Sequence, residues 1–203
     1  MPQYFKPSAQ RKPAVAKVKN RIRIIGGVWR SRILEFGDTG ELRPTANRVR
    51  ETLFNWLGQT LHGKRCLDLF SGSGALGFEA ASRGAAAVVM LELHLAAVDA
   101  LKTNQQRLAA TACRVIAVDA LKFMDANDEK FDVVFVDPPF SSGLMATVLD
   151  KLPAHLQSGA VVYTEWGDPI AEVLSKLTVA RWEITKQGRA GAVHFALLCI
   201  PPV

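Results

Sequence analysis

The sequence has few of the residues that build metal sites and disulfide frameworks. Its 203 residues include three cysteines and four histidines, and their positions match no metal-ligand spacing. Cys66, Cys113 and Cys199 are far apart and each lies in an apolar run, so we expect small core residues in a reducing compartment. The pattern therefore predicts neither a bound metal nor a disulfide.

Long apolar segments are also missing. No run reaches the length of a membrane span, and the N-terminus lacks the hydrophobic core of a signal peptide. We therefore expect a cytoplasmic protein that does not enter a membrane. With 49% apolar residues, the chain is long enough for one principal domain and a small appendage, and a monomer is the default.

Acidic residues are absent from the first 34 positions. This segment holds nine of the 25 Lys and Arg residues, which leaves 16 basic residues against all 19 acidic ones in the rest of the chain. A basic arm on a slightly acidic body favours a polyanionic partner, and nucleic acid is the first candidate. Residues 1–20 mix Pro, Lys, Ala and Gln without periodicity, so we expect a disordered basic tail. A transit peptide has a similar charge, but the prolines and weak amphipathicity of the tail argue against one.

Residues 21–62 predict a small N-terminal extension. Segments 21–25 and 28–34 have the pattern of two short strands around a glycine pair, and 48–57 has that of an amphipathic helix. Arginines and a tryptophan on such a hairpin can grip phosphates and stack a base, although a basic hairpin also suits a soluble sheet edge. The candidate nucleic-acid-binding residues are Arg21, Arg23, Trp29, Arg30, Arg32, Arg43, Arg48 and Arg50.

Residues 63–203 alternate between strand and helix patterns. Short apolar runs predict strands at 65–70, 87–92, 113–118, 131–136, 160–164, 182–186 and 193–200, the last two joined by a turn at 188–191. Helical periodicity occurs between them, at 76–83, 95–108, 144–156 and 170–177. Repeated strand–helix–strand units impose right-handed crossovers. The sequence therefore predicts an α/β fold with a doubly wound, seven-stranded, mostly parallel sheet.

The tetrapeptide Asp137-Pro138-Pro139-Phe140 directly follows the continuous apolar strand predicted at 131–136. Neither proline can continue a strand ladder, so Asp137 should close this strand at the carboxyl edge of the sheet, where open α/β sheets bind ligands. The carboxylate and the Pro138 carbonyl can accept the two hydrogens of an exocyclic base amine, which favours a nitrogen with its lone pair free to attack. Phe140 offers a flat face for an extruded base. A plainer interpretation is an acid that ends a strand before a stiff loop. This interpretation accounts for the Asp-Pro pair, but it accounts less well for the full Asp-Pro-Pro-Phe motif with its aromatic residue.

A glycine-rich loop follows the first strand of this region. Residues 72–77 form a Gly-x-Gly-x-x-Gly pattern, and Glu92 lies twenty residues after its first glycine. This spacing is compatible with a dinucleotide whose ribose is held by Glu92. Asp68, however, places a negative charge where a pyrophosphate would lie, and it suits a cationic amino-acid group instead. With Asp119 and Asp137, these acids close four successive strands at one edge and predict a ligand cleft.

Together these motifs resemble the class I methyltransferases that use S-adenosylmethionine, in the branch that acts on amino groups of bases. Residues 24–30, 42–45 and 48–57 narrow the resemblance to the RsmD family, the guanine-N2 methyltransferases of 16S, small-subunit ribosomal RNA. The similarity spans residues 21–200. It implies a Rossmann-like methyltransferase domain at 63–203 and an RNA-binding role for 21–62.

The resemblance also implies individual roles. Asp137, Pro138, Pro139 and Phe140 would hold the flipped guanine with its N2 facing the methyl group. The cofactor-binding residues would be Asp68, Phe70, Ser71, Gly72, Ser73 and Gly74 for the methionine part, Glu92 and Leu93 for the ribose, and Asp119 and Ala120 for the adenine. The substrate would be a 30S particle or an assembly intermediate more than naked RNA. Two features depart from the family: no polar residue follows Glu92, and the turn region 187–191 is unusually basic and glycine-rich.

Other functions fit parts of the same pattern. An adenine-N6 or other base-amino methyltransferase acting on DNA or another RNA would use the Asp-Pro-Pro-Phe motif in the same way. A nicotinamide-dependent oxidoreductase would use the glycine pattern but conflicts with Asp68. An RNA-binding assembly factor without activity would have no need for Asp137 or the glycine loop.

Overall fold

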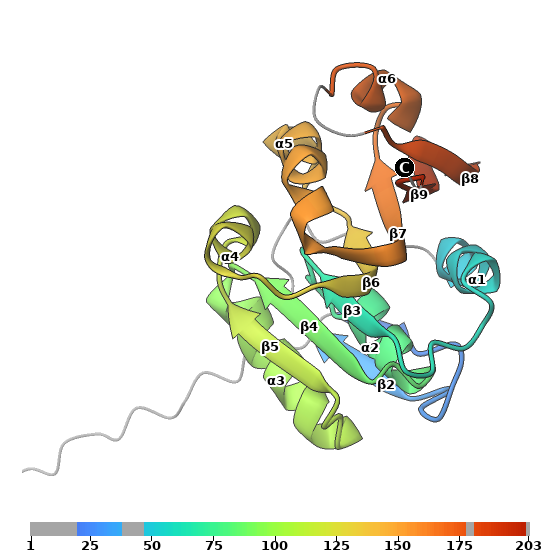
Figure 1. Cartoon of the computed structure of the whole chain (residues 1–203). Helices are drawn as coiled ribbons and strands as arrows, with labels where there is room; N and C mark the ends of the chain where they lie inside the picture. The colour runs from blue at the N-terminus through green and yellow to red at the C-terminus, as the bar shows by residue number, and fades with distance from the viewer. Residues whose placement is uncertain (1–19, 38–46, 178–180, 202–203) are drawn as a thin grey trace, which may run out of the picture.

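The computed structural model describes residues 20–37, 47–177 and 181–201. Of the predicted basic tail, only Asn20 lies within these ranges, as the first residue of a strand. The central sheet has seven strands in the order β5-β4-β3-β6-β7-β9-β8, and β1 and β2 form a separate antiparallel hairpin (Figure 1).

The elements follow each other along the chain in the alternation that the sequence predicts. The described strands are β1 (Asn20–Arg23), β2 (Ile33–Phe36), β3 (Arg65–Asp68), β4 (Ala87–Glu92), β5 (Cys113–Ala117), β6 (Phe131–Val136), β7 (Leu156–Trp166), β8 (Glu183–Ala190) and β9 (Val193–Cys199). The described α-helices are α1 (Asn47–Trp56), α2 (Ala75–Ser82), α3 (Leu95–Leu108), α4 (Ala120–Ala126), α5 (Leu144–Lys151) and α6 (Ile170–Leu174). Short 3-10 helices occur at Phe140–Ser142 and Leu152–His155.

Helices cover both faces of the sheet (Figure 1). Apolar side chains of α1, α2, α3 and the β1–β2 hairpin pack on one face, and those of α4, α5 and α6 pack on the other. Parallel pairing joins β5, β4, β3, β6 and β7, and β9 then pairs antiparallel with both β7 and β8. These observations confirm the predicted α/β class and the doubly wound, mostly parallel, seven-stranded sheet.

The N-terminal extension shares the core of the larger domain. Leu34 of β2 and Phe54 of α1 belong to the same buried cluster as Phe78 of α2 and Phe135 of β6. The rings of Phe54 and Phe135 lie 6.2 Å apart. The boundary that we propose near residue 62 therefore separates sequence motifs, not two hydrophobic cores.

Two local predictions are wrong. The strand predicted at 28–34 begins only at Ile33, and the turn predicted at 188–191 falls later, at residues 191–192. Gly188 lies inside β8, opposite Phe195, where a Cβ atom would be 2.5 Å from the phenyl ring. Packing of this ring across the two strands, and not a turn, therefore requires glycine at this position.

The loop between β1 and β2 is held by the C-terminal end of α2. The amide of Val28 donates to the Ser82 carbonyl (2.8 Å), and the amide of Trp29 donates to the Ser82 hydroxyl (2.9 Å). Gly27 has a φ of +74°, and a Cβ atom there would lie 1.9 Å from the Ser82 carbonyl oxygen. Because this backbone bonds to a helix end instead of a partner strand, the second strand of the hairpin starts late.

A buried carboxylate ties the extension to α2. Glu79 has no exposed surface, and its carboxylate accepts from the Ile25 amide (2.8 Å) and from Nε of Arg83 (2.9 Å). Nη1 of Arg50 lies 3.5 Å from the same carboxylate and is equally buried. Nη2 of Arg50 also donates to the Arg23 carbonyl (2.9 Å) and to the Asn47 side chain (2.6 Å). Two arginines and a backbone amide thus depend on one negative charge.

The described residues also lack two kinds of structural feature. In the described ranges, no helix is long and apolar enough to cross a bilayer. Among the same residues, no cluster of three or more His, Cys, Asp or Glu side chains is arranged to hold a metal ion. Burial raises the pKa of Cys66 and of Cys113 to about 12, so both remain neutral thiols in the core.

We predict that Glu79→Gln lowers the free energy of unfolding by about 3–5 kcal/mol, because it leaves the buried guanidinium of Arg50 without its counter-charge. Urea denaturation of the two proteins measures this difference. Asp125→Asn, which removes the exposed partner of Lys151, is the matched control and should leave stability nearly unchanged. Equal effects of the two substitutions would contradict the structural importance of Glu79.

Candidate active site at the carboxyl edge of the sheet

Four acidic residues lie at the carboxyl ends of neighbouring parallel strands. Asp68 is the last residue of β3, Glu92 the last of β4, and Asp137 follows β6 directly, while Asp119 comes two residues after β5. The ladder pairs Asp68 with Met90 and with Phe135, so Glu92 and Asp137 each lie two residues beyond Asp68 at the same edge of the sheet. The structure therefore brings the four acids to one edge, as the sequence predicts.

The glycine loop turns the chain from β3 into α2. Gly72 and Gly74 both have positive φ angles, 49° and 80°, and a Cβ atom on Gly74 would lie 2.6 Å from the side chains of Leu101 and Phe78. Gly77 fits against Met90, where a Cβ atom would lie 2.8 Å from the methionine side chain. The first two glycines therefore serve the turn, and the third allows the helix to pack closely on the sheet.

Asp68 lies buried beneath this loop. Its side chain accepts a hydrogen bond from the Gly77 amide (3.0 Å), and the Ser71 hydroxyl donates to its backbone carbonyl (3.2 Å). Burial raises the pKa of Asp68 to about 7, and the nearby charge of Glu92 adds to the rise, although the Gly77 bond opposes it. A buried acid with this pKa is poised to ionise when a cationic group approaches.

Glu92 closes the other side of the loop. Its Oε2 accepts from the Gly72 amide (2.9 Å), and its Oε1 accepts from the amides of Leu93 and His94 (both 2.8 Å). Three backbone bonds fix the orientation of the carboxylate, while Oε2 has one bond and acceptor capacity beyond it. Leu93 is 62% exposed and lies on the rim beside this acid.

Asp119 and Ala120 begin α4. The side chain of Asp119 accepts from the Lys122 amide (3.0 Å) and caps the helix, and Ala120 behind it is buried. Asp119 is only partly exposed. This carboxylate therefore caps the N-terminus of α4 and also lies at the rim of the predicted cleft.

The tetrapeptide after β6 forms a corner with an exposed aromatic ring. Asp137 is partly exposed, Pro138 is buried, and Pro139 and Phe140 are exposed, with Phe140 at 45%. The Phe140 ring packs edge-on against Trp166 of β7, with a centroid distance of 5.5 Å and an interplanar angle of 65°. The contact orients this ring while part of its surface stays open to solvent.

Sequence reasoning missed one acidic residue at this edge. Glu165, near the end of β7, is buried and accepts a hydrogen bond from the Tyr163 hydroxyl (2.9 Å). The ladder pairs Val136 with Thr164, so Glu165 lies level with Asp137 on the neighbouring strand. The available signal was its position immediately after the strand predicted at 160–164, the same pattern that identified the other acids.

The candidate RNA-binding residues divide into exposed and buried groups. The exposed arginines are Arg21, Arg23, Arg30, Arg32 and Arg48, and Trp29 is half-buried. Arg50 is fully buried and forms hydrogen bonds with Glu79, Asn47 and a backbone carbonyl. It therefore has no exposed surface that could contact RNA, and we no longer propose it as an RNA-binding residue. Arg43 lies outside the described residues.

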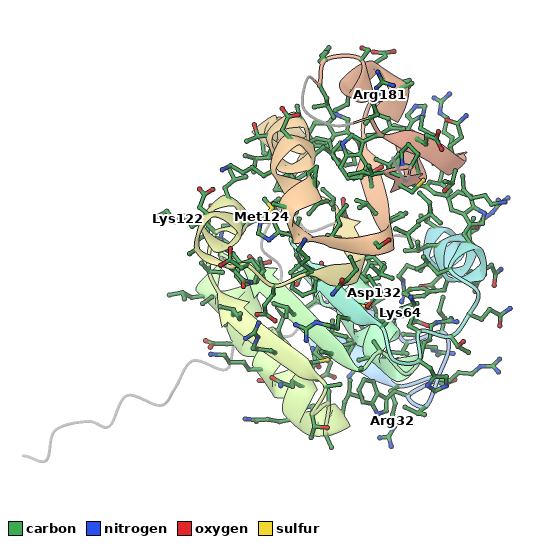
Figure 2. The ribbon with its side chains drawn as sticks, viewed as in Figure 1. Arg32, Lys64, Lys122, Met124, Asp132 and Arg181 are labelled. Atoms are coloured by element: carbon green, nitrogen blue, oxygen red, sulfur yellow. The ribbon has the colours of Figure 1, made fainter. Side chains whose placement is uncertain are left out.

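The basic loop at 25–32 and the acidic edge are separated by the length of α2. The glycine loop precedes the first residue of α2, whereas the basic loop bonds to Ser82 at its last turn. Eight helical residues span about 12 Å. Figure 2 shows Arg32 at the lower right of the molecule and Lys122, on α4, at its left side. The structure therefore does not place the basic loop beside Asp137.

Comparison with known proteins assigns the family. A family model described as conserved hypothetical protein 95 matches residues 22–199. The chain is 41% identical to ribosomal RNA small subunit methyltransferase D of Escherichia coli strain K12 over 181 residues, which cover 87% of this chain and 89% of that relative. The chain belongs to the RsmD family. The resemblance based on sequence motifs is thereby confirmed.

Other relatives agree with this RsmD assignment. The Haemophilus influenzae protein with the same name is 40% identical over 187 residues, covering 88% of this chain and 94% of the relative. The solved structure of yhhF from Escherichia coli, provisionally named a methyltransferase, superposes with a TM-score of 0.76 at 38% identity. It covers 88% of this chain and 97% of the other, so nearly the whole RsmD-family fold is shared.

We predict that Asp68 makes the folded state less stable as the pH rises. Its pKa of about 7 lies above the ordinary carboxyl value, so the folded protein binds this proton more tightly than the unfolded chain does. The contribution is largest at low pH and is lost as the pH passes through about 7. Relative to Asp68→Asn, the wild-type free energy of unfolding should fall by about 3 kcal/mol between pH 5 and pH 8. Urea titrations of both proteins at both pH values measure this change. If the free energies of unfolding of the two proteins changed equally with pH, the prediction would be wrong.

Proposed function

We propose that this RsmD-family protein transfers a methyl group from S-adenosylmethionine to the exocyclic N2 of one guanine in small-subunit ribosomal RNA. The observation that carries the proposal is the convergence of the Asp137–Phe140 corner with Asp68, Glu92 and the glycine loop at one sheet edge. The names of the relatives, ribosomal RNA small subunit methyltransferase D, supply the class of RNA. We propose guanine N2 as the methylated atom for two reasons: the corner can accept the hydrogens of a base amine, and the sequence resembles a family that methylates guanine N2.

The residues at this edge suit the cofactor chemically. A cationic amino-acid group would lower the raised pKa of Asp68 and ionise it, so carboxylate and cation stabilise each other in the buried site. Oε2 of Glu92, fixed by the Gly72 amide, has acceptor capacity for a ribose hydroxyl. The pyrophosphate of a nicotinamide dinucleotide would instead meet the negative charge of Asp68. These features favour S-adenosylmethionine over the dinucleotide.

The corner residues would align the base. When bound, S-adenosylmethionine supplies a methyl group on a cationic sulfur, which is already a good leaving group. In our proposal the Asp137 carboxylate and the Pro138 carbonyl accept the two N2 hydrogens and direct the nitrogen lone pair toward that methyl group. Phe140, oriented by Trp166, stacks on the extruded base. Catalysis is then mostly alignment, with Asp137 stabilising the positive charge that develops on N2 until one of the N2 hydrogens leaves as a proton.

The exposed arginines of the N-terminal extension would bind the RNA backbone. Because the loop that carries Arg30 and Arg32 lies about one α2 length from the glycine loop, these two arginines would grip a part of the RNA remote from the reacting base. A structured 30S particle or assembly intermediate presents such remote phosphates in fixed positions. We accordingly propose a cytoplasmic enzyme that acts as a monomer on a ribosomal particle.

The first test is transfer of labelled methyl from S-adenosylmethionine to small ribosomal subunits that lack base methylation. Nuclease digestion and nucleoside identification should show N2-methylguanosine at one site. Label on adenosine, or transfer only to DNA, would overturn the guanine assignment in favour of an adenine-N6 or other base-amino methyltransferase.

The same assay should show no detectable turnover with Asp137→Ala, because the substitution removes an acceptor that aligns N2. Calorimetry with S-adenosylmethionine should show little change in cofactor affinity, since the glycine loop, Asp68 and Glu92 remain. Near-normal turnover of this variant would refute the role assigned to Asp137.

We predict that Arg30→Ala combined with Arg32→Ala weakens binding to the RNA particle and makes it less sensitive to salt. Each lost phosphate contact should reduce the slope of log affinity against log salt by roughly 0.7–0.9. Filter binding across a salt series measures the slope. Lys151→Ala, on α5 at the other face of the sheet, is the control, and an equal loss with this variant would contradict a specific role for the loop.

A further inference from the structure

The pair formed by Tyr163 and Glu165 lies at the proposed active site but has no part in the mechanism described so far. Both side chains are buried, and the Tyr163 hydroxyl donates to Oε2 of Glu165 at 2.9 Å. Burial raises the pKa of Tyr163 well above its ordinary value, and the charges of Glu165 and Asp137 contribute further. The hydroxyl therefore stays protonated and remains a donor that holds the Glu165 carboxylate in one orientation.

The sheet register places Glu165 beside Asp137. Phe135 pairs with Tyr163, and their rings contact on one face of the sheet with centroids 6.5 Å apart. Two residues further along each strand come Asp137 and Glu165, which the alternation of a strand assigns to that same face. Neighbouring strands lie about 4.8 Å apart. Two carboxylates can therefore face adjacent positions of one ligand.

The hydrogen-bonding edge of guanine matches two such acceptors. Guanine presents the N1 hydrogen next to the two N2 hydrogens, so three donors lie side by side. In our mechanism Asp137 and the Pro138 carbonyl use the two N2 hydrogens, which leaves the N1 hydrogen in need of a neighbouring acceptor. Adenine presents a lone pair at N1 beside its amino group, and a desolvated carboxylate would repel it.

We propose that Glu165 is a specificity-determining residue that accepts the N1 hydrogen of the flipped guanine, and that Tyr163 is its positioning residue. The inference rests on the proposed base-amine methyltransferase function and names what makes that site select guanine. Because only 7% of Glu165 is exposed, water can do little to compensate a base that lacks this hydrogen. Asp137 alone would bind an amino group of any base, and the Tyr163–Glu165 pair would add the contact that distinguishes guanine from other bases.

The test uses reconstituted particles in which the methylated guanine, once mapped, is replaced by 2-aminopurine. This base keeps the C2 amino group but has a lone pair at N1 and no hydrogen there. The wild-type enzyme should prefer guanine by about 100-fold or more in kcat/KM, as expected when a buried acceptor is left unpaired. In Glu165→Gln, the amide can donate to the N1 lone pair, so the preference should fall below about tenfold.

Two variants separate reading of the base from a structural role. Tyr163→Phe keeps the carboxylate, so it should retain the guanine preference while KM rises and kcat changes little. Glu183→Gln, an exposed glutamate at the far end of β8, should behave as wild type in every respect. Thermal unfolding and cofactor affinity of Glu165→Gln should match the wild-type values.

Several outcomes would overturn the inference. A Glu165→Gln enzyme with the wild-type preference would do so, and so would equal loss of preference in Glu165→Gln and Tyr163→Phe, which would indicate simple disruption of the pair. Wild-type enzyme that methylates both bases equally well would remove the role of Glu165 but leave the proposed function standing. Failure to map any methylated guanine in the first place would overturn the proposed function itself.

Discussion

The parallel pairing of β4, β3, β6 and β7 is the constraint on which the site depends. Parallel strands all point the same way, so the residues that end them meet at one edge, and the register keeps those ends within a few residues of one another. β3 lies in the middle of this set, with β4 on one side and β6 on the other. Asp68 at its end is therefore desolvated, and this burial is the main cause of its raised pKa. The chemistry that we propose for the site is a consequence of the strand order.

The sequence predicted this edge well because buried parallel strands are apolar on both faces. A polar side chain is unfavourable in the middle of such a strand, so Glu92 and Asp137 mark the ends of β4 and β6, whereas β3, predicted to run to residue 70, ends at Asp68. The helix predicted at 95–108 also has the bounds that the structure gives α3, since its apolar periodicity is regular. The same rule would have identified Glu165, which directly follows the strand predicted at 160–164, although in the structure this acid lies inside β7, which continues to Trp166.

The errors concern residues whose roles depend on partners distant in the sequence. Arg50 looks like a surface arginine in a basic segment, and only folding places it against Glu79, 29 residues later. Gly188 looks like part of a turn, and only the register of β8 with β9 shows that it accommodates the ring of Phe195. No local pattern distinguishes a buried guanidinium from an exposed one, or a turn glycine from one beneath an aromatic ring. Contacts of this kind are set by tertiary packing.

The separation of the basic loop from Asp137 bears on how the enzyme would use its binding energy. Extruding a guanine would cost unstacking energy of a few kcal/mol, and in our proposal the small corner around Asp137 and Phe140 contacts only the base. Phosphate contacts about one α2 length away can offset this cost only if the RNA between the two regions is rigid. A flexible strand would bind at the loop without presenting its base, because the intervening chain would absorb the strain. Under the proposed function, a folded ribosomal particle would therefore be a better substrate than a short single strand, and recognition of its shape would be linked to extrusion of the base.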